Sequence, residues 1–409
     1  MNPNNKTNLQ NLLQVPVIVA ALGYLVDMYD LFLFSVVRVP SLKALGVDAD
    51  HLLPEGVFLL NMQLAGLLIG GVVWGILGDK KGRLSVLFGS ILLYSLANIA
   101  NGMVASMPQY AALRFIAGVG LAGELGAGIT LVAEILPKHL RGYGSVLVAT
   151  LGVLGGVLAY FVADLFEWRM SYYVGGGLGL LLLILRINVF ESGLYVQLKE
   201  KKVDRGNIMK LFNNKARFTK YILAILVGVP LWFVVGILIT FSPEFGAQLG
   251  LSEPIIAGKA IMLAFSGQVF GDIVSGLLSQ WLQSRKKAIR IFMLLSFSVM
   301  LVYLLAPIQN TTQLYILCAL LGFCNGYWTL FIILAAELFG TNLRATVATS
   351  VPNFVRGTAI ILTSLFVWLK PSLGVTYGAL AIGAGIVTLS LISLHFLDET
   401  FSKEMDYVE

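Results

Sequence analysis

The chain has 409 residues, of which 57% are hydrophobic and only 12% are charged. A soluble domain carries about 25% charged residues, so this chain cannot cover its surface with polar groups, and lipid must solvate much of it. The net charge of +6 would favour a nucleic-acid partner in a soluble protein. In a membrane chain it indicates basic cytoplasmic loops instead, so we expect the lipid bilayer and no nucleic acid as a partner.

The first 14 residues are polar and rich in asparagine, with Lys6 as their one basic residue. They lack the basic start, short apolar core and cleavage site of a signal peptide. We therefore expect the N-terminus to stay in the cytoplasm.

Long apolar runs follow one another along the rest of the chain. A helix needs about 20 mostly apolar residues to cross the bilayer. Runs of this kind cover 15–37, 56–78, 84–105, 109–134, 143–165, 169–190, 219–243, 255–281, 288–306, 312–337, 345–368 and 373–396. The sequence thus predicts an all-α membrane protein with twelve transmembrane helices.

A basic, polar stretch separates the sixth run from the seventh. It divides the chain into an N-terminal six-helix bundle (1–198), a cytoplasmic linker (199–218) and a C-terminal six-helix bundle with a short cytoplasmic tail (219–409). With the N-terminus inside, the cytoplasmic segments hold 20 of the 28 Lys and Arg residues and the outer segments hold five. This bias predicts a multi-pass plasma-membrane protein (inner membrane, if bacterial) with both termini cytoplasmic.

The two halves resemble each other. Two pairs of segments recur at an offset of 203 residues: Ala133-Glu134 with Leu140-Arg141, and Ala336-Glu337 with Leu343-Arg344. The loop from Gly75 to Arg83 has a degraded partner that runs from Gly276, at the end of the eighth run, to Lys287, with Gln280 in place of Asp79. Related halves of six helices are typical of transporters whose site lies between the repeats.

The loop Gly75–Arg83 reads GILGDKKGR and resembles the signature between helices two and three of the major facilitator superfamily. Four further segments are similar to proton-coupled symporters of sugars, aromatic acids and other metabolites: Arg114 to Glu124, Glu134 to Gly142, Trp168 to Ser192, and Asp398 to Glu404. Gly193 departs from the family pattern, which usually has a proline there. The resemblance implies two bundles around a midplane cavity, alternating access and a monomer.

The resemblance also implies cytoplasmic gate residues. The acid of the signature loop, here Asp79, caps a helix N-terminus of the opposite half near Ala345, which the helix dipole favours. We interpret further charges at helix ends as parts of the same gates. The predicted gating residues are Asp79, Arg83, Glu134, Arg141, Glu337, Arg344 and Asp272. Asp272 has a second interpretation, as a coupling acid in the eighth helix.

Charges inside a membrane span are costly and are therefore functional candidates, with a structural ion pair as the alternative. Asp27 and Asp30 lie three residues apart, on one face of the first helix. Asp30 lies about 22 Å from the inner surface and Arg114 about 20 Å, so we predict that these two form an ion pair. By resemblance to sugar and aromatic-acid symporters, Asp30 is the main proton carrier, Asp27 the second candidate and Arg114 the partner.

Arg356 lies near mid-membrane in the eleventh helix. A guanidinium keeps its charge and binds a carboxylate bidentately, which suits an organic-acid substrate. The segment from Asn353 to Gly357 resembles the arginine site of organic-acid symporters. Glu124, a further candidate for proton coupling, is a rival partner for Arg356. If those two pair, the substrate need not be an anion.

Other side chains offer amide or aromatic surface to a cavity, although membrane aromatics more often face lipid or packing. These predicted substrate-binding residues are Asn353, Gln63, Trp232, Tyr327, Trp328, Asn325 and Gln268. The sequence contains no nucleophile elbow, phosphate loop or metal-ligand spacing, so we expect no enzyme activity, no cofactor and no metal.

These patterns favour proton-coupled symport of a small organic anion, such as a mono- or dicarboxylate or an aromatic acid. Three alternatives stay open. The first is a proton-coupled exporter of a metabolite, drug or siderophore, because the fold is the same for both directions. The second is a transporter of an organic cation, a zwitterion or a sugar. The third is a non-transporting sensor on the same fold.

Overall fold

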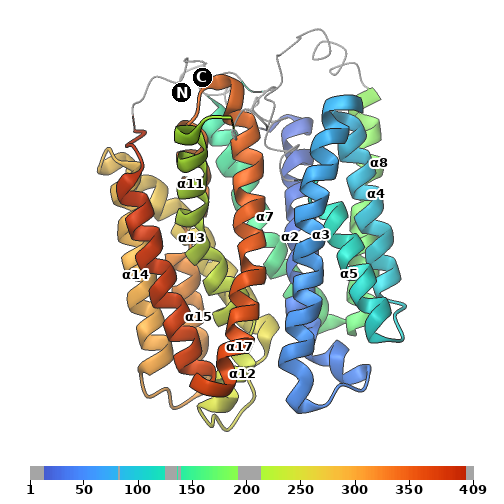
Figure 1. Cartoon of the computed structure of the whole chain (residues 1–409). Coiled ribbons are helices and arrows are strands. Elements are labelled where there is room, and N and C mark those ends of the chain that lie inside the picture. Colours follow the sequence, from blue (N-terminus) through green and yellow to red (C-terminus); the bar gives the residue numbers. More distant parts are fainter. Residues whose placement is uncertain (1–12, 82, 125–135, 137–139, 192–212, 402–409) are drawn as a thin grey trace, which may run out of the picture.

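A computed structural model describes residues 13–81, 83–124, 136, 140–191 and 213–401, and within them all regular structure is helical (Figure 1). The helices of the first half are α2 (Val15–Ala44), η1 (Ala49–His51), α3 (Leu52–Lys81), α4 (Arg83–Asn101), α5 (Met107–Leu121), α7 (Arg141–Leu165) and α8 (Trp168–Glu191). Those of the second half are α11 (Lys215–Phe233), η3 (Val234–Ile239), α12 (Ser242–Gln248), α13 (Ala257–Trp281), α14 (Arg285–Leu305), α15 (Thr311–Cys324), α16 (Trp328–Glu337) and α17 (Thr341–Phe396).

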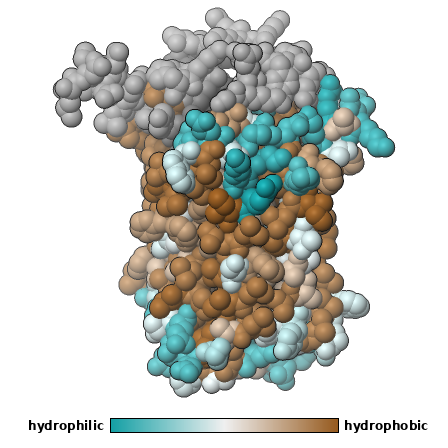
Figure 2. All heavy atoms as spheres, turned by 90° about the vertical axis from the view of Figure 1, so that its left-hand side faces the viewer, coloured by the Kyte–Doolittle hydropathy of each residue, from teal (hydrophilic) through white to brown (hydrophobic). Residues whose placement is uncertain are grey.

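The predicted all-helical fold with twelve long segments is confirmed. In the described part of the chain, η3 continues α11, α16 continues α15, and α17 contains two helices that meet at Gly374. Eight of the described helices are long and apolar enough to cross a membrane. On the face that Figure 2 shows, hydrophobic residues cover the middle of the molecule and hydrophilic residues lie toward both ends. Such a distribution is what a bilayer requires of a spanning protein.

The helices pack in the same way in both halves. In the first half α2 packs on α7 and α3 on α5, and in the second half α11 packs on α17 and α13 on α15. The halves meet where α7 contacts α13 and where α3 contacts α17. The repeated packing fits the internal repeat of the sequence.

Glycines allow the closest of these contacts. A side chain at Gly66 or Gly70 of α3 would collide with the backbone of α5, and one at Gly118 of α5 would collide with the backbone of Gln63. Gly267 and Gly271 of α13 have the same relation to α15. Small residues of this kind let membrane helices approach backbone to backbone.

Several helix ends differ from the predicted runs. The seventh run contains Pro230, which lacks an N–H donor, and its helix continues as the π-helical turns of η3. The tenth run is broken between Cys324 and Trp328. The last two runs join as α17, where Gly374 at φ 70° makes the bend. Helix α11 begins at Lys215, inside the predicted linker, because the Asn214 side chain accepts hydrogen bonds from two N–H groups of its first turn.

Candidate functional site

Two buried acids lie on one face of α2 at the centre of the bundle. Asp27 and Asp30 are 0% and 1% exposed, and neither carboxylate has a hydrogen-bond partner among the described residues. The Oδ2 atom of Asp27 lies 3.7 Å from the Nη2 atom of Arg356 on α17. This contact joins the two halves through opposite charges.

Arg356 has unused hydrogen-bonding capacity. Its side chain is completely buried, yet Nε, Nη1 and Nη2 donate no hydrogen bond within the described residues. A distance of 3.7 Å is an ion-pair contact that is too long for a hydrogen bond. Buried donors without acceptors are unfavourable, so this guanidinium is suited to receive an anion with hydrogen-bonding oxygens.

More unpaired polar atoms belong to residues on both halves. Tyr24 of α2 lies within electrostatic range of Arg356, Asp27 and Asp272. Buried oxygens without a described hydrogen-bond partner belong to Tyr24, Asp272, Asn325, Tyr327 and Asn353. Asn325, Tyr327 and Asn353 were predicted to bind substrate, Asp272 was predicted as a gating residue or a coupling acid, and Tyr24 was missed. Its signal was its position on α2, three residues before Asp27 and therefore on the same face.

Asp272 and Asn325 also hold the break between α15 and α16. The Oδ1 atom of Asp272 accepts a hydrogen bond from the Thr329 backbone N–H at 3.1 Å, in the first turn of α16. The Asn325 side-chain amide donates to the Leu231 carbonyl at 3.0 Å. A carboxylate at a helix N-terminus is favourable, so Asp272 has a structural role. Its second oxygen, Oδ2, has no hydrogen-bond partner among the described residues. Gln268, one turn earlier on α13, is 7% exposed.

The predicted ion pair between Asp30 and Arg114 is wrong in this structure. Arg114 donates instead to the side-chain oxygen of Gln63 on α3 and lies against the rings of Phe34 and Tyr172, at 4.9 and 5.9 Å from their centroids. The close α3–α5 packing brings the Gln63 amide to Arg114. Gln63, predicted to bind substrate, is therefore a partner of Arg114 here.

Asp30 lies near α4 and α8. Its Oδ1 atom occupies the space beside Gly175 of α8, where a larger side chain would collide with it, and the side chain of Asn98 on α4 approaches it. The depths of Asp30 and Arg114 fitted a pair, but the two side chains point to different neighbours. Asp30 is thus a buried acid without an ion-pair partner among the described residues.

Glu124 forms a separate ion pair with Arg186 of α8. Both side chains are buried, with Arg186 Nη1 donating to Glu124 Oε2 at 3.0 Å and Nη2 donating to Oε1. The absence of a side chain at Gly23 leaves room for this bidentate pair next to α2. The alternative in which Glu124 neutralises Arg356 is therefore wrong in this structure. No pattern in the sequence predicts this role of Arg186.

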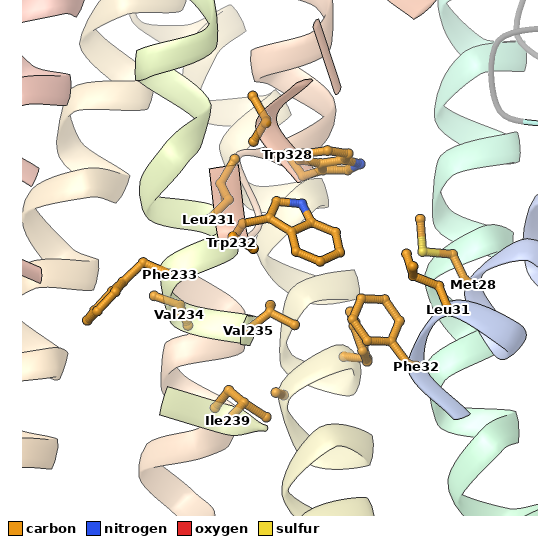
Figure 3. Packing of buried hydrophobic residues seen from close by; sticks show 14 of the residues in the cluster. Met28, Leu31, Phe32, Leu231, Trp232, Phe233, Val234, Val235, Ile239 and Trp328 are labelled. Carbon is orange, nitrogen blue, oxygen red and sulfur yellow. The ribbon is translucent and has the colours of Figure 1, made fainter. Parts of the chain in front are cut away.

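Aromatic residues border the centre. The rings of Phe32 on α2 and Trp232 on α11 stack with their centroids 5.9 Å apart, and Phe32 also contacts Phe265 of α13 at 4.4 Å. Figure 3 shows Trp232 and Trp328 pointing from the second half toward α2. A small cavity beside them is lined by Leu31, Phe32, Ser35, Leu60, Leu64, Trp232, Val235, Gly236, Thr240 and Ala359. The predicted Trp232 therefore lies at the interface, and Phe32 and Phe265 were missed because apolar helices contain many phenylalanines.

Of the predicted gate residues, Glu337 has described side-chain contacts. It lies 3.5 Å from Arg285 and accepts a hydrogen bond from Thr400 at 2.7 Å. Glu134 lies outside the described residues. The side chains of four more gate residues also lie outside the described part: Asp79, Arg83, Arg141 and Arg344.

The segment after α17 is attached to the start of α14. Glu399 accepts hydrogen bonds from Ser284 and from the Arg285 backbone N–H. Partial burial raises the pKa of Glu399, but the hydrogen bonds from Ser284 and from the N–H groups of Phe401, Arg285 and Thr400 outweigh it and lower the pKa below its ordinary value. This attachment therefore stabilises the fold at neutral pH and weakens as the pH falls through the lowered pKa.

The central arrangement is suited to binding and proton exchange. It combines two buried acids, one buried guanidinium with free donors, and polar atoms from both halves. Within the described residues no group of three or more His, Cys, Asp or Glu side chains could hold a metal ion. Both described cysteines, Cys318 and Cys324, are buried free thiols.

Comparisons with known proteins give one consistent family. The sequence matches the family model of the Major Facilitator Superfamily over residues 20–364. It is 27% identical to a probable 4-methylmuconolactone transporter of Cupriavidus pinatubonensis, covering 79% of this chain and 76% of that protein. It is 26% identical to a cis,cis-muconate transport protein of Acinetobacter baylyi, covering 93% of both. The fold matches the inward-open conformation of the xylose transporter of E. coli with a TM-score of 0.71 and 16% identity, covering 95% of this chain and 97% of that one.

Proposed function

The chain belongs to the major facilitator superfamily of membrane transporters, and from this premise we propose that it is a proton-coupled symporter of a small organic anion that works by alternating access. The observation that carries the proposal is the contact between Asp27 and Arg356. Two opposite charges meet there at the interface of the halves, with guanidinium donors left free. Symport needs a site where a proton and an anion are bound together.

The chemistry of this pair couples the two solutes. When Asp27 is ionised, its carboxylate is the counter-charge of the Arg356 guanidinium. Protonation of Asp27 removes that counter-charge and leaves Arg356 as a buried cation, which is unfavourable until another anion arrives. A substrate carboxylate supplies the anion and satisfies the free donors bidentately. Binding of the proton and of the anion thus favour each other.

Asp30 is the second acid of the proposal and remains our candidate for the main proton carrier. It is buried one helical turn from Asp27 and has no cation within ion-pair distance among the described residues. Burial without a cation favours the protonated, neutral form of this side chain. Contact with Arg114 or with water favours its ionised form. Alternating access would change the access of water and the distance to Arg114. These changes support a role of Asp30 in taking up a proton on one side and releasing it on the other.

The relatives support an organic acid as the solute. The names of two of them specify cis,cis-muconate and benzoate. Both are small carboxylates, which suits a single buried guanidinium. The stacked Phe32 and Trp232 beside the site favour a flat, unsaturated carbon skeleton. We propose mono- and dicarboxylates of this size as the first solutes to test.

The test uses proteoliposomes that contain the purified protein, with a pH indicator outside. Addition of benzoate or muconate should alkalinise the outside as protons enter with the anion. Arg356→Ala should abolish this signal, whereas Arg290→Ala, which changes an exposed arginine on α14, should leave it intact. A signal that survives Arg356→Ala would contradict the assigned anion site.

The acids are tested by separating uphill uptake from exchange. Asp30→Asn should abolish uptake driven by a pH gradient while leaving exchange of labelled for unlabelled solute partly intact, because exchange needs no net proton release. Asp27→Asn should resemble it and also weaken the pH dependence of solute affinity. Equal loss of uptake and exchange in Asp30→Asn, at normal protein levels, would make that acid a structural residue.

A further inference from the structure

A second contact between the halves lies far from the central site. Arg38 is the 24th residue of α2 and lies about 35 Å along it from Val15, toward the end where α3 begins, the lower end in Figure 1. Its Nη1 atom lies 2.7 Å from Oε1 of Glu244 on α12, and its Nη2 atom donates to Oε2 of Glu244 at 2.9 Å. One residue belongs to the first half and the other to the second.

Arg38 is enclosed by both halves. It donates to the Leu52 carbonyl of the first half at 3.3 Å and to the Thr240 carbonyl of the second half at 3.4 Å. Its guanidinium lies 4.7 Å from the centroid of the Phe241 ring. The Arg38 side chain is 0% exposed and that of Glu244 is 18% exposed. A buried arginine of this kind depends on its acid, because separation of the halves would remove most of its partners.

Weaker contacts close the same end. The Thr240 hydroxyl donates to the Ser35 hydroxyl at 3.4 Å, one helical turn closer to the centre than Arg38. Asn61 of α3 binds the side chains of Thr363 and Ser364 on α17, at 2.8 and 3.1 Å. Ser35 and Thr240 also line the small cavity. The ion pair therefore lies between that cavity and the lower end of the bundle.

We propose that Arg38 and Glu244 form the gate of the lower end, which holds this end closed and must separate in each transport cycle. The charge bias of the loops predicts that this end faces outward. The pair would then be the outer gate, opposite the cytoplasmic gates that the sequence predicts. The inference rests on alternating access and does not depend on the solute or on the proton.

Ser35 provides the reporter for this gate. It is 2% exposed in the closed structure, so a cysteine at this position is protected from thiol reagents until the halves separate at the lower end. The experiment uses Ser35→Cys in a protein that lacks the two native cysteines, purified in detergent without solute. The rate of alkylation by N-ethylmaleimide then measures how often the gate opens.

Glu244→Gln should increase this alkylation rate by about tenfold, because it removes the negative charge that pairs with the buried Arg38 guanidinium and replaces one accepting oxygen by an NH2 group. Arg38→Lys should also increase it, since an ammonium cannot form the bidentate contact. The matched control is Glu253→Gln, which changes an acid that contacts Thr311 within the second half. This control should leave the rate unchanged.

An unchanged rate in Glu244→Gln, with the protein monodisperse, would overturn the proposal. If Glu244→Gln aggregates, Glu244→Asp replaces it, because the shorter acid keeps the charge and withdraws the carboxylate from Arg38. No increase in Glu244→Asp and Arg38→Lys would overturn the proposal equally. Since the measurement contains neither solute nor proton gradient, a failure of the gate is distinguishable from a failure of the proposed symport.

Discussion

Two buried arginines in this protein differ in how far their hydrogen-bond donors are used. Arg186 forms a bidentate pair with Glu124, whereas Arg356 meets Asp27 at 3.7 Å and keeps free donors. A fully paired guanidinium is a structural element, since it has little capacity left for a ligand. A partly paired one can accept a ligand without first losing its hydrogen bonds. This contrast is why we assign the anion to Arg356.

Loss of one partner of the Glu124–Arg186 pair should destabilise the protein strongly. Glu124→Gln leaves the Arg186 charge buried without its counter-charge, which costs about 3–5 kcal/mol. The double variant Glu124→Gln/Arg186→Gln removes both charges and should recover much of that loss. Thermal unfolding of the purified variants in detergent measures both effects.

The same variants test the original prediction of a coupling role for Glu124. If Glu124→Gln unfolds like the unmodified protein and loses proton-driven uptake alone, Glu124 carries a proton and the structural assignment is wrong. If stability falls and returns in the double variant, the pair is structural.

The sequence locates the charges inside the membrane spans but does not show how they pair. Residue number along a helix predicts depth in the membrane, and the pairing of Asp30 with Arg114 was predicted from their common depth and from the family resemblance. Pairing also depends on the rotation of each helix about its axis, which is set by packing against several others. Arg114 turns toward Gln63 because the glycines of α3 and α5 bring those helices into backbone contact.

At the level of whole helices, prediction succeeded where the signal is local. Apolar runs located the twelve segments because each must cross the same thickness of hydrocarbon. The break between α15 and α16 was missed, because it depends on contacts with other helices. Asp272 accepts a hydrogen bond from the Thr329 backbone N–H, and the side-chain amide of Asn325 donates to the Leu231 carbonyl. Pro230 and Gly374 are local signals for the other two irregular points.

Adjacent glycines on α3 offer a matched test of helix packing. Gly70→Ala places a methyl group against the backbone of Val119, and overpacking of this kind costs about 1–3 kcal/mol. Gly71→Ala places the same group where nothing lies within 4 Å. Because alanine favours the helix, Gly71→Ala should be neutral or stabilising by up to about 1 kcal/mol.

Thermal unfolding of the two variants side by side provides the measurement. The unfolding temperature of Gly70→Ala should fall, and that of Gly71→Ala should stay or rise. Equal unfolding temperatures would mean that α3 and α5 do not approach as closely as this structure places them.

At the level of the whole molecule, polar contacts between the halves occur at two depths. Asp27 with Arg356 joins them at the centre, and Arg38 with Glu244 joins them at the lower end. Each contact pairs a residue of α2 with one of the second half. Helix α2 therefore links the proposed substrate site to the proposed gate. When Arg356 exchanges Asp27 for a substrate anion, the central ion pair between the halves is lost. Among the described residues, the remaining polar contacts from α2 to the second half are those of Arg38 and Ser35 at the lower end.

The charges of the loops predict the orientation of this assembly in the membrane. The segments on the side of the N-terminus hold 20 Lys and Arg residues against five on the other side, a bias that predicts a cytoplasmic location for the richer side. Alkaline phosphatase fused after Val47, between α2 and α3, should therefore be active, because that enzyme folds outside the cytoplasm. Fusion to the C-terminus at Glu409 should give an inactive phosphatase and, with green fluorescent protein instead, a fluorescent cell. The reverse pattern would mean that the protein has the opposite orientation in the membrane. Arg38 and Glu244 would then form a cytoplasmic gate with the same contacts between the halves.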